Sequence, residues 1–176
     1  DDPWQDLPDD IHKYDRGHVL VMGGSRGKSG APTLAALSAL RTGAGWASLA
    51  LSPAAKGQYQ QALDLTEEEF FIDEQEVDSK ALGEFLGARR VKSVIVGPGM
   101  RASPINRDLL ETLAAWDGFC LFDAGALHGL ADQVSRVSKA PKAGHWLATP
   151  HPGEWQKMGF MQKQLSNLED LAKAHE

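Results

Sequence analysis

Short apolar runs alternate with longer segments of helical character along the chain. Strands are predicted over 18–23, 46–52, 92–99, 118–125 and 145–154, the last of which runs into a proline-rich turn. Apolar runs of this length, bounded by glycine or proline, are typical of buried strands. Helices are predicted over 29–43, 53–63, 78–89, 103–116, 126–132 and 166–175. The segment 64–75 is ambiguous, and its Phe70-Phe71-Ile72 run could form an edge strand.

Several of the expected helix ends carry capping signals. Gly43 is placed to end the helix 29–43, because glycine is common just after a helix. Asp78 or Ser79 would cap the helix 78–89, since short polar side chains accept hydrogen bonds from the first turn. Ser103 would cap the helix 103–116, with Pro104 in its first turn.

Strands separated by helices predict βαβ units, and hence an α/β protein with a mostly parallel sheet. Right-handed crossovers place helices on both faces, which gives a three-layer α/β/α sandwich. We expect a single domain over 1–176, with 1–11 as an N-terminal extension. Ligands of such sheets bind at the carboxyl ends of the strands. Four unusual sequences fall there: 23–31, 97–100, 123–127 and 149–154.

The first of these sequences, GGSRGKSGA, matches neither standard phosphate-binding loop. Gly27-Lys28-Ser29 fits the end of a P-loop, but the first glycine of that pattern would fall on Met22. The loop is not G-x-G-x-x-G either. Its glycines would still let a ligand approach the backbone, and a following helix N-terminus favours an anion. An ordinary strand-to-helix turn is the alternative.

The other three sequences each allow a structural and a functional interpretation. The Gly97-Pro98-Gly99 run is either a tight turn or part of a ligand site. Asp123 could hold a hydroxyl group or a hydrated metal, or it could cap the next helix. His151 lies between two prolines, which suits a positioned ligand contact or acid–base group. The alternative is a surface turn with Glu154 near a helix N-terminus.

Composition narrows the class of partner. The net charge of -6 argues against a nucleic-acid or anionic-membrane binder, although a local site could still hold a small anion. Cys120 is the single cysteine, which excludes an intramolecular disulfide and fits a reducing, cytoplasmic setting. No apolar run reaches membrane-spanning length, and the first ten residues have no signal-peptide character. No His or Cys pair has metal-ligand spacing, so no metal is assigned.

Taken in order, the motifs resemble a known family. His12-Lys13, VLVMGGSRGKSGAPTLAALSALRTGAGWASLA, VIVGPGM, DAGAL and TPHPGE are similar to segments of the ADP/ATP-dependent NAD(P)H-hydrate dehydratases. These enzymes belong to the ribokinase-like superfamily. The resemblance extends from about His12 to Met158, and the order of the motifs is more specific than any one of them.

The resemblance implies repair of a nicotinamide cofactor. Family enzymes use ATP or ADP, with Mg²⁺, to phosphorylate the hydroxyl group of hydrated NADH or NADPH, and loss of phosphate restores the cofactor. The loop would then hold the hydrated dinucleotide. The residues that match family substrate contacts or the family's strand-end aspartate are Ala31, Gly99, His151 and Asp123. The residues that match the family's loop are Gly23, Gly24, Gly27, Lys28 and Gly30.

The chain also departs from the family pattern. Gly125 stands where a second aspartate is usual, and His128 where asparagine is frequent. The glycine-rich loop that carries the family's catalytic aspartate has no counterpart, because no glycine follows Gly159. We therefore expect a C-terminally incomplete domain: a fragment, a chain completed by a partner, or a domain that has lost catalysis.

Two other functions compete with the dehydratase. One is a non-catalytic dinucleotide-binding or regulatory module, and the other is a ribokinase-like small-molecule kinase. The sequence does not distinguish ATP from ADP or NADH from NADPH. Self-association into a homo-oligomer is expected because an incomplete sheet exposes an edge and apolar surface.

Overall fold

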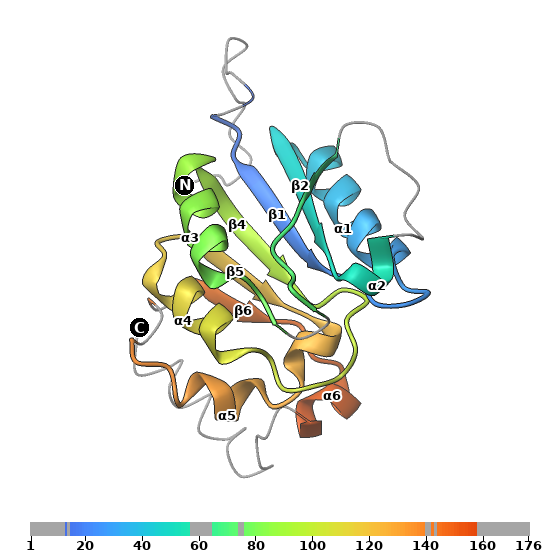
Figure 1. Ribbon diagram of the computed structural model, residues 1–176, viewed down its shortest axis with the longest axis vertical. Coiled ribbons are helices and arrows are strands. Elements are labelled where there is room, and N and C mark those ends of the chain that lie inside the picture. The colour runs from blue at the N-terminus through green and yellow to red at the C-terminus, as the bar shows by residue number, and fades with distance from the viewer. Residues whose placement is uncertain are drawn as a thin grey trace.

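Six parallel strands form one sheet in the order β3-β2-β1-β4-β5-β6 (Figure 1). The computed structural model describes residues 13, 15–56, 65–73, 76–139, 142 and 144–157. The strands are β1 His18–Gly23, β2 Trp46–Leu51, β3 Thr66–Glu68, β4 Val91–Val96, β5 Phe119–Phe122 and β6 Trp146–Ala148. The strand order reverses between β1 and β4, and this is where ligands bind in doubly wound sheets.

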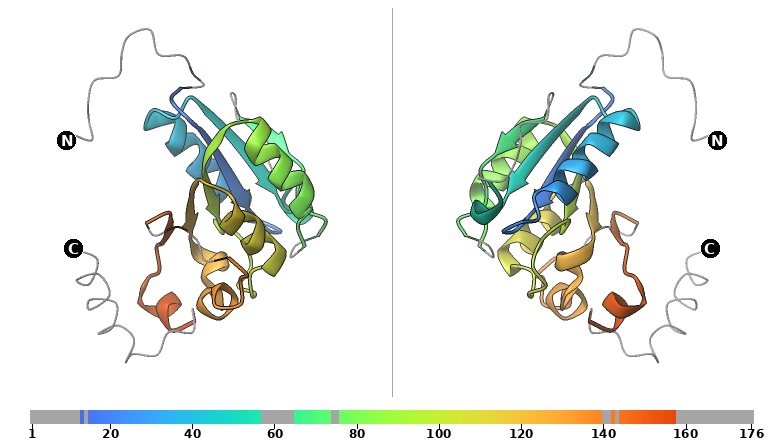
Figure 2. Two further views of the ribbon diagram at one scale, coloured as in Figure 1. Left: turned by 90° about the vertical axis from the view of Figure 1, so that its left-hand side faces the viewer. Right: turned by 90° about the vertical axis from the view of Figure 1, so that its right-hand side faces the viewer.

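The helices lie on both faces of this sheet, so the three-layer prediction is confirmed (Figure 2). α1 packs over β1 and β2, whereas α3 and α4 lie together on the opposite face. The helices are α1 Gly30–Arg41, α2 Pro53–Lys56, α3 Ser79–Ala88, α4 Arg107–Ala115, α5 Leu130–Val134, α6 Pro152–Lys157 and the short 3-10 helix η1 Ala124–Leu127. No helix in the described part of the chain is long and apolar enough to cross a membrane.

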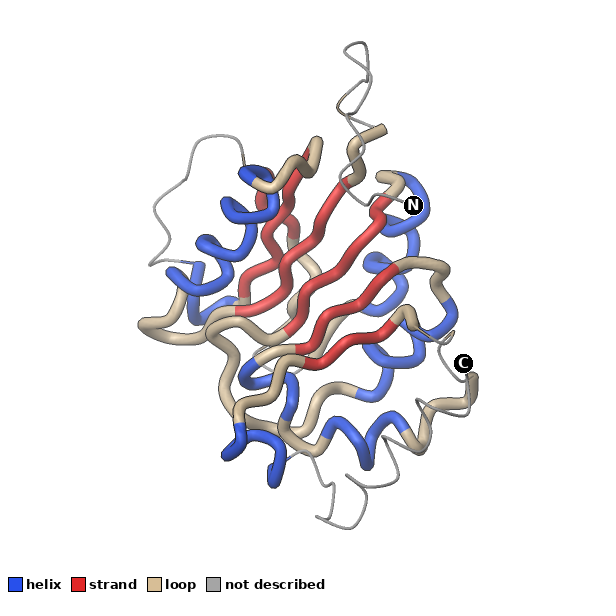
Figure 3. The backbone as a smooth tube through the Cα atoms, turned by 180° about the vertical axis from the view of Figure 1, so that it is seen from behind, coloured by secondary structure: helices blue, strands red, loops and turns tan. Residues whose placement is uncertain are grey.

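The two faces of the sheet are buried to different extents. The face toward α3 and α4 carries the larger core, including Leu20, Val94 and Phe122. On the α1 face a smaller core covers mainly β1 and β2. Farther along that face Phe119 is 55% exposed and Leu147 is 60% exposed. Figure 3 shows the strands toward β6 with no helix in front of them. The described residues therefore cover only half of this face.

The edge strand lies earlier than the sequence suggested. β3 is formed by Thr66–Glu68, within the segment 64–75 that the sequence left ambiguous, and not by the Phe70-Phe71-Ile72 run that it offered as an edge strand. Phe70 and Phe71 are buried in the larger core, and Phe70 packs edge-on against Phe85 with 5.0 Å between ring centroids. The aromatic residues therefore anchor the loop that follows the strand instead of forming the strand.

Two of the predicted helix ends are confirmed, and a third is wrong. Asp78 caps α3 by accepting a hydrogen bond from the Ala81 N–H at 2.9 Å, as expected. Gly43 follows the C-cap of α1 with a positive φ of 107°, also as expected. The predicted start of a helix at 103 is wrong. α4 begins at Arg107, because the Asn106 side chain caps it through the Leu109 N–H at 3.0 Å.

The predicted helix 126–132 is broken in two. η1 ends at Leu127 and α5 begins at Leu130, and between them Gly129 has a left-handed φ of 67°. The proline-rich turn after β6 continues into α6, with Glu154 in its first turn, which agrees with the alternative that placed Glu154 near a helix N-terminus. The predicted helix 166–175, the end of the helix 53–63 and the extension 1–11 lie outside the described residues.

Cys120 is buried in the larger core, and burial raises the pKa of its thiol to about 12.

Candidate functional site

The loop between β1 and α1 interlocks with the turn after β4. The Gly24 N–H donates to the Pro98 carbonyl at 2.9 Å, and the Ser25 hydroxyl donates to the Gly99 carbonyl at 2.8 Å. A Cβ atom on Gly23 would lie 2.2 Å from the Pro98 oxygen. Packing between the two loops therefore demands glycine at this position, with or without a ligand.

The start of α1 is exposed and carries no acidic side chain. The N-cap residue Ser29 makes no side-chain capping hydrogen bond, and the first turn has no acidic residue. A Cβ atom on Gly30 would meet nothing within 4 Å, so no packing demands a glycine there. Ala31 and Lys28 are both exposed. Since N–H groups at a helix start lack intrahelical partners, this corner suits an anionic ligand.

Asp123 is tied to the neighbouring strand and does not cap a helix. Its Oδ1 accepts a hydrogen bond from the Thr149 hydroxyl at 2.8 Å, and the Thr149 N–H donates to the Phe122 carbonyl at 3.1 Å. Asp123 occupies the N-cap position of η1, but its carboxylate makes no capping hydrogen bond there, so the carboxylate does not act as the expected helix cap. The carboxylate is instead held at the carboxyl edge between β5 and β6.

His151 has a structural role in addition to any binding role. Its Nδ1 accepts hydrogen bonds from the Gly153 N–H at 3.0 Å and the Glu154 N–H at 3.3 Å. The Glu154 carboxylate in turn accepts from the His151 N–H at 3.1 Å. This reciprocal arrangement is a capping box at the start of α6. Because Nδ1 accepts, a neutral ring carries its hydrogen on Nε2, which lies 3.4 Å from Glu154 Oε1.

A cavity of about 230 Å³ opens at this edge, and we call it the carboxyl-end cavity. Its lining residues are Lys28, Met100, Ala102, Ala124, Gly125, Leu127, His128, His151 and Glu154. Of the predicted site residues it brings together Lys28 and His151. Gly99 and Asp123 each precede a lining residue without lining the cavity themselves.

Sequence reasoning missed most of the cavity wall. His128 was noted only as a departure from the family pattern, yet it lines the cavity together with the other departure, Gly125. The Nδ1 atom of His128 is buried and has no hydrogen-bond partner within the described residues. Position along the chain gave a weak signal, because both residues lie within five positions of the strand-end Asp123. Only the tertiary structure brings them close to Lys28.

The uncovered half of the α1 face forms a larger, mostly apolar hollow of about 740 Å³ along β4, β5 and β6. Phe119, Leu121 and Leu147 line it, and it extends to Asp123 and Thr149 at the carboxyl edge. An apolar surface of this kind usually contacts further protein. The hollow therefore adjoins the candidate site without resembling a polar ligand site.

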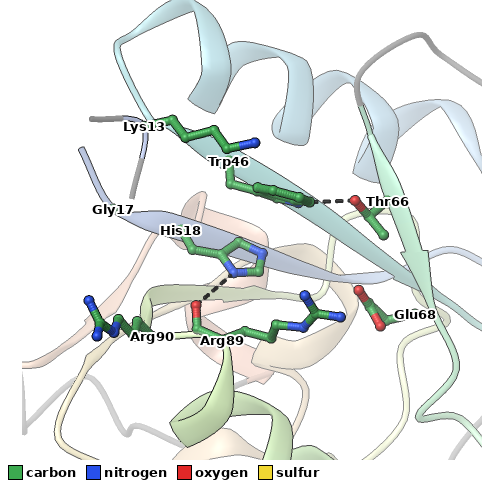
Figure 4. Close-up of a pocket in the computed structure, with 8 residues that line it drawn as sticks. All are labelled: Lys13, Gly17, His18, Trp46, Thr66, Glu68, Arg89 and Arg90. Atoms are coloured by element: carbon green, nitrogen blue, oxygen red, sulfur yellow. Dashed lines mark hydrogen bonds between the residues drawn. The ribbon is translucent and has the colours of Figure 1, made fainter. Parts of the chain in front are cut away.

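A third pocket, of about 40 Å³, lies at the opposite, amino end of the strands (Figure 4). His18 is 8% exposed there, and its ring nitrogens lie 2.9 Å from the Ser48 hydroxyl and 3.3 Å from the Arg89 carbonyl. The Trp46 indole N–H donates to the Thr66 hydroxyl at 3.0 Å (Figure 4). This pocket is too small for a nucleotide, and its principal polar groups already have protein partners.

Burial at the amino end also shifts two ionisable groups. Desolvation lowers the pKa of His18 below its ordinary value, although its hydrogen bond to the Arg89 carbonyl acts in the opposite direction. Desolvation raises the pKa of Glu68, while the charge of Arg89 and the Ser48 hydroxyl partly oppose that shift. Both shifts come from packing, so they do not by themselves indicate a reactive site.

Metal binding finds no support in the part of the chain that the structure describes. No group of three His, Cys, Asp or Glu side chains there could hold a metal ion. The described residues therefore offer no all-protein ligand set for a resident Mg²⁺ ion.

The parallel sheet, with its polar cavity at the carboxyl edge, defines a doubly wound α/β protein. A crystal structure of a ribokinase-like superfamily protein from Enterococcus faecalis aligns with a TM-score of 0.65 and 20% identity, over 87% of this chain and 51% of that one. ADP/ATP-dependent NAD(P)H-hydrate dehydratase from Bacillus subtilis, co-crystallised with ATP and Mg²⁺, aligns with a TM-score of 0.62 and 23% identity, over 87% and 50%. At these identities the likeness concerns the fold.

The sequence assigns the family. The family model described as NAD(P)H-hydrate dehydratase matches residues 19–176, and the chain belongs to that family. It is 33% identical over 149 residues to the bifunctional NAD(P)H-hydrate repair enzyme Nnr of Coxiella burnetii, which is 85% of this chain and 28% of that protein. The chain thus spans about half, or less, of the length of these relatives.

Proposed function

We propose that this chain carries the substrate-holding part of an ADP/ATP-dependent NAD(P)H-hydrate dehydratase. The observation that supports this most is the interlocked pair of loops at the carboxyl edge, where the Gly24 N–H bonds to Pro98 and the Ser25 hydroxyl bonds to Gly99. Those loops contain two of the family's motifs, and they lie beside the other two, at Asp123 and His151. The reaction would restore NADH or NADPH from its hydrate.

Each matching residue offers a plausible contact. The N–H of Ala31, in the first turn of α1, and the exposed Lys28 suit phosphate oxygens. His151 would donate from Nε2 in place of its 3.4 Å contact with Glu154 Oε1, since Nδ1 is occupied by backbone donors. Asp123 has one oxygen bonded to Thr149, and its other oxygen could accept a hydroxyl group of the substrate. These contacts would orient the hydrate without reacting with it.

We place the phosphoryl-transfer residues outside this sequence. The chain spans about half of the aligned dehydratase, the described residues offer no ligand set for Mg²⁺, and an apolar hollow adjoins Asp123. Further protein over that hollow would lie beside the substrate. Nucleotide and Mg²⁺ would supply and activate the phosphoryl group when bound.

Homo-oligomer formation and cytoplasmic localisation both stay predictions. Light scattering would test the first of them.

Turnover tests this proposal directly. Hydrated NADH is mixed with the purified chain, Mg²⁺ and either ATP or ADP, and the return of reduced-nicotinamide absorbance is followed. In parallel, calorimetry measures the affinity for the hydrate. Binding without turnover supports the substrate-holding role, whereas recovery of absorbance would place the catalytic base within this chain. Absence of binding would contradict the proposal.

The same assay separates the competing functions. A stable phosphorylated product would indicate a small-molecule kinase. A non-catalytic module predicts binding without turnover even after a relative's C-terminal half is added. The open apolar hollow is compatible with the non-catalytic module. Restored turnover in the mixture would exclude that module.

A further inference from the structure

His128 is held in an unusual way for a partly buried histidine. It lies between η1 and α5, where the left-handed Gly129 turns the chain. Its Nδ1 is shielded from solvent and has no hydrogen-bond partner in the described part of the chain. Buried polar atoms are nearly always paired, so each exception calls for an explanation. With Nδ1 shielded, Nε2 is the ring nitrogen that a ligand in the carboxyl-end cavity can reach.

The other polar groups of the cavity favour an anion. Lys28 lines the same cavity and forms no ion pair with any described residue. Glu154 is already engaged by the backbone and ring of His151. Gly125 adds no carboxylate, and any side chain there would meet the Met100 carbonyl, which lies 2.5 Å from a Cβ placed on this glycine. Lys28 and His128 therefore offer donors in this cavity, while the Glu154 carboxylate already contacts His151.

We propose that His128 and Lys28 form a phosphate subsite within the carboxyl-end cavity. His128 donates from Nε2 to a phosphate oxygen, and Lys28 supplies the opposite charge. The inference rests on the proposed function for the identity of the ligand, because both the hydrated dinucleotide and ADP or ATP carry phosphate. It assigns a binding role to a residue that the family motifs did not select.

Calorimetry with matched variants tests the subsite. The ligands are hydrated NADH, ADP and nicotinamide riboside, which has no phosphate. His128→Phe keeps a ring but removes the donor, and we expect it to weaken phosphate-bearing ligands by about tenfold or more. Loss of hydrated-NADH affinity alone would assign the subsite to the dinucleotide, and loss of ADP affinity alone would assign it to the nucleotide co-substrate. Nicotinamide riboside binding should not change.

His145→Phe is the control. His145 also has a buried Nδ1 without a hydrogen bond, but it stacks on Phe119 and lines the apolar hollow. We expect this variant to bind every ligand like the parent. Equal effects of the two substitutions would overturn the proposal, as would unchanged hydrated-NADH and ADP affinities in His128→Phe.

A direct probe separates failure of the subsite from failure of the proposed function. Inorganic phosphate is titrated into the parent chain while the ring signals of His128 are followed by NMR. A saturable shift supports the subsite even if hydrated NADH does not bind, in which case only the dehydratase proposal fails. No shift, together with intact dinucleotide binding, would remove His128 from the site. No shift and no binding would overturn both.

Discussion

At the amino end of the sheet both ring nitrogens of His18 have protein partners, whereas at the carboxyl end Nδ1 of His128 has none. The two pockets also differ in size, about 40 Å³ against about 230 Å³. Paired polar groups in a small pocket stabilise a fold, because each would otherwise be buried without compensation. In the described part of the chain Nδ1 of His128 is shielded and unbonded, and the ring lines the larger cavity, where Nε2 can bond to a ligand. The comparison therefore distinguishes His18, which has a structural role, from His128, which is a candidate for ligand binding.

The largest expected effect comes from a glycine at the carboxyl edge. In Gly23→Ala the new methyl group would overlap the Pro98 carbonyl, so we expect a loss of about 3 kcal/mol or more in the free energy of unfolding. Gly30→Ala is the matched control, because its Cβ would meet open space and its stability should hardly change. Urea denaturation measures both. Equal stability of the two variants would contradict the interlocked arrangement.

His18→Ala should give the next largest loss of stability. It removes ring packing against Trp46 and Phe85 and leaves the buried Ser48 hydroxyl without its histidine partner. We expect the free energy of unfolding to fall by about 2–3 kcal/mol. Affinity for hydrated NADH, measured by calorimetry, should stay that of the parent. A selective loss of affinity in this variant would make the amino end part of the functional site.

His151→Ala should show the reverse pattern. We expect affinity for hydrated NADH to fall about tenfold, which corresponds to one lost hydrogen bond to a charged or polar ligand group. Loss of the capping bonds to Gly153 and Glu154 should cost only about 1 kcal/mol of stability. His151→Asn keeps a capping side chain, so it separates the two roles. Restored affinity in His151→Asn would show that only the cap matters.

The smallest effect is the pH dependence from His18. Burial lowers the pKa of this imidazole in the folded state, so the unfolded chain binds the proton more readily. The stability that the neutral ring contributes is complete above about pH 6.5 and is lost as the pH falls through the folded-state pKa. Glu68 acts oppositely, because its raised pKa favours the fold at lower pH.

The contribution of His18 can be isolated by difference. Urea midpoints of the parent chain and of His18→Gln are compared between pH 7.5 and pH 5. The parent should lose more stability than the variant over that interval, since glutamine does not titrate. Parallel curves for the two proteins would show that the buried ring carries no pH-dependent stability.

Local pattern alone predicted the parallel sheet, the helices on both faces and the four sequences at strand ends. These features follow from strand-length apolar runs and from the near-universal right-handed crossover. The cap at Asp78 was predictable too, because capping depends on neighbouring residues. The start of α4 was not, since Asn106 and Ser103 are both good caps and burial of Ile105 is a tertiary matter.

The residues of the candidate site also divide into those that the sequence selected and those that only the folded structure brought in. Residues such as Lys28 and His151 lie in recognisable motifs, and the sequence by itself selected them. His128 joined them only through the folded chain, because the turn at Gly129 and the end of β5 bring it to the wall that Lys28 shares. Among the six histidines the sequence selected only His151 for the site. Burial and hydrogen-bond pairing, which depend on contacts between distant segments, show that His18 supports the fold and make His128 the proposed ligand contact.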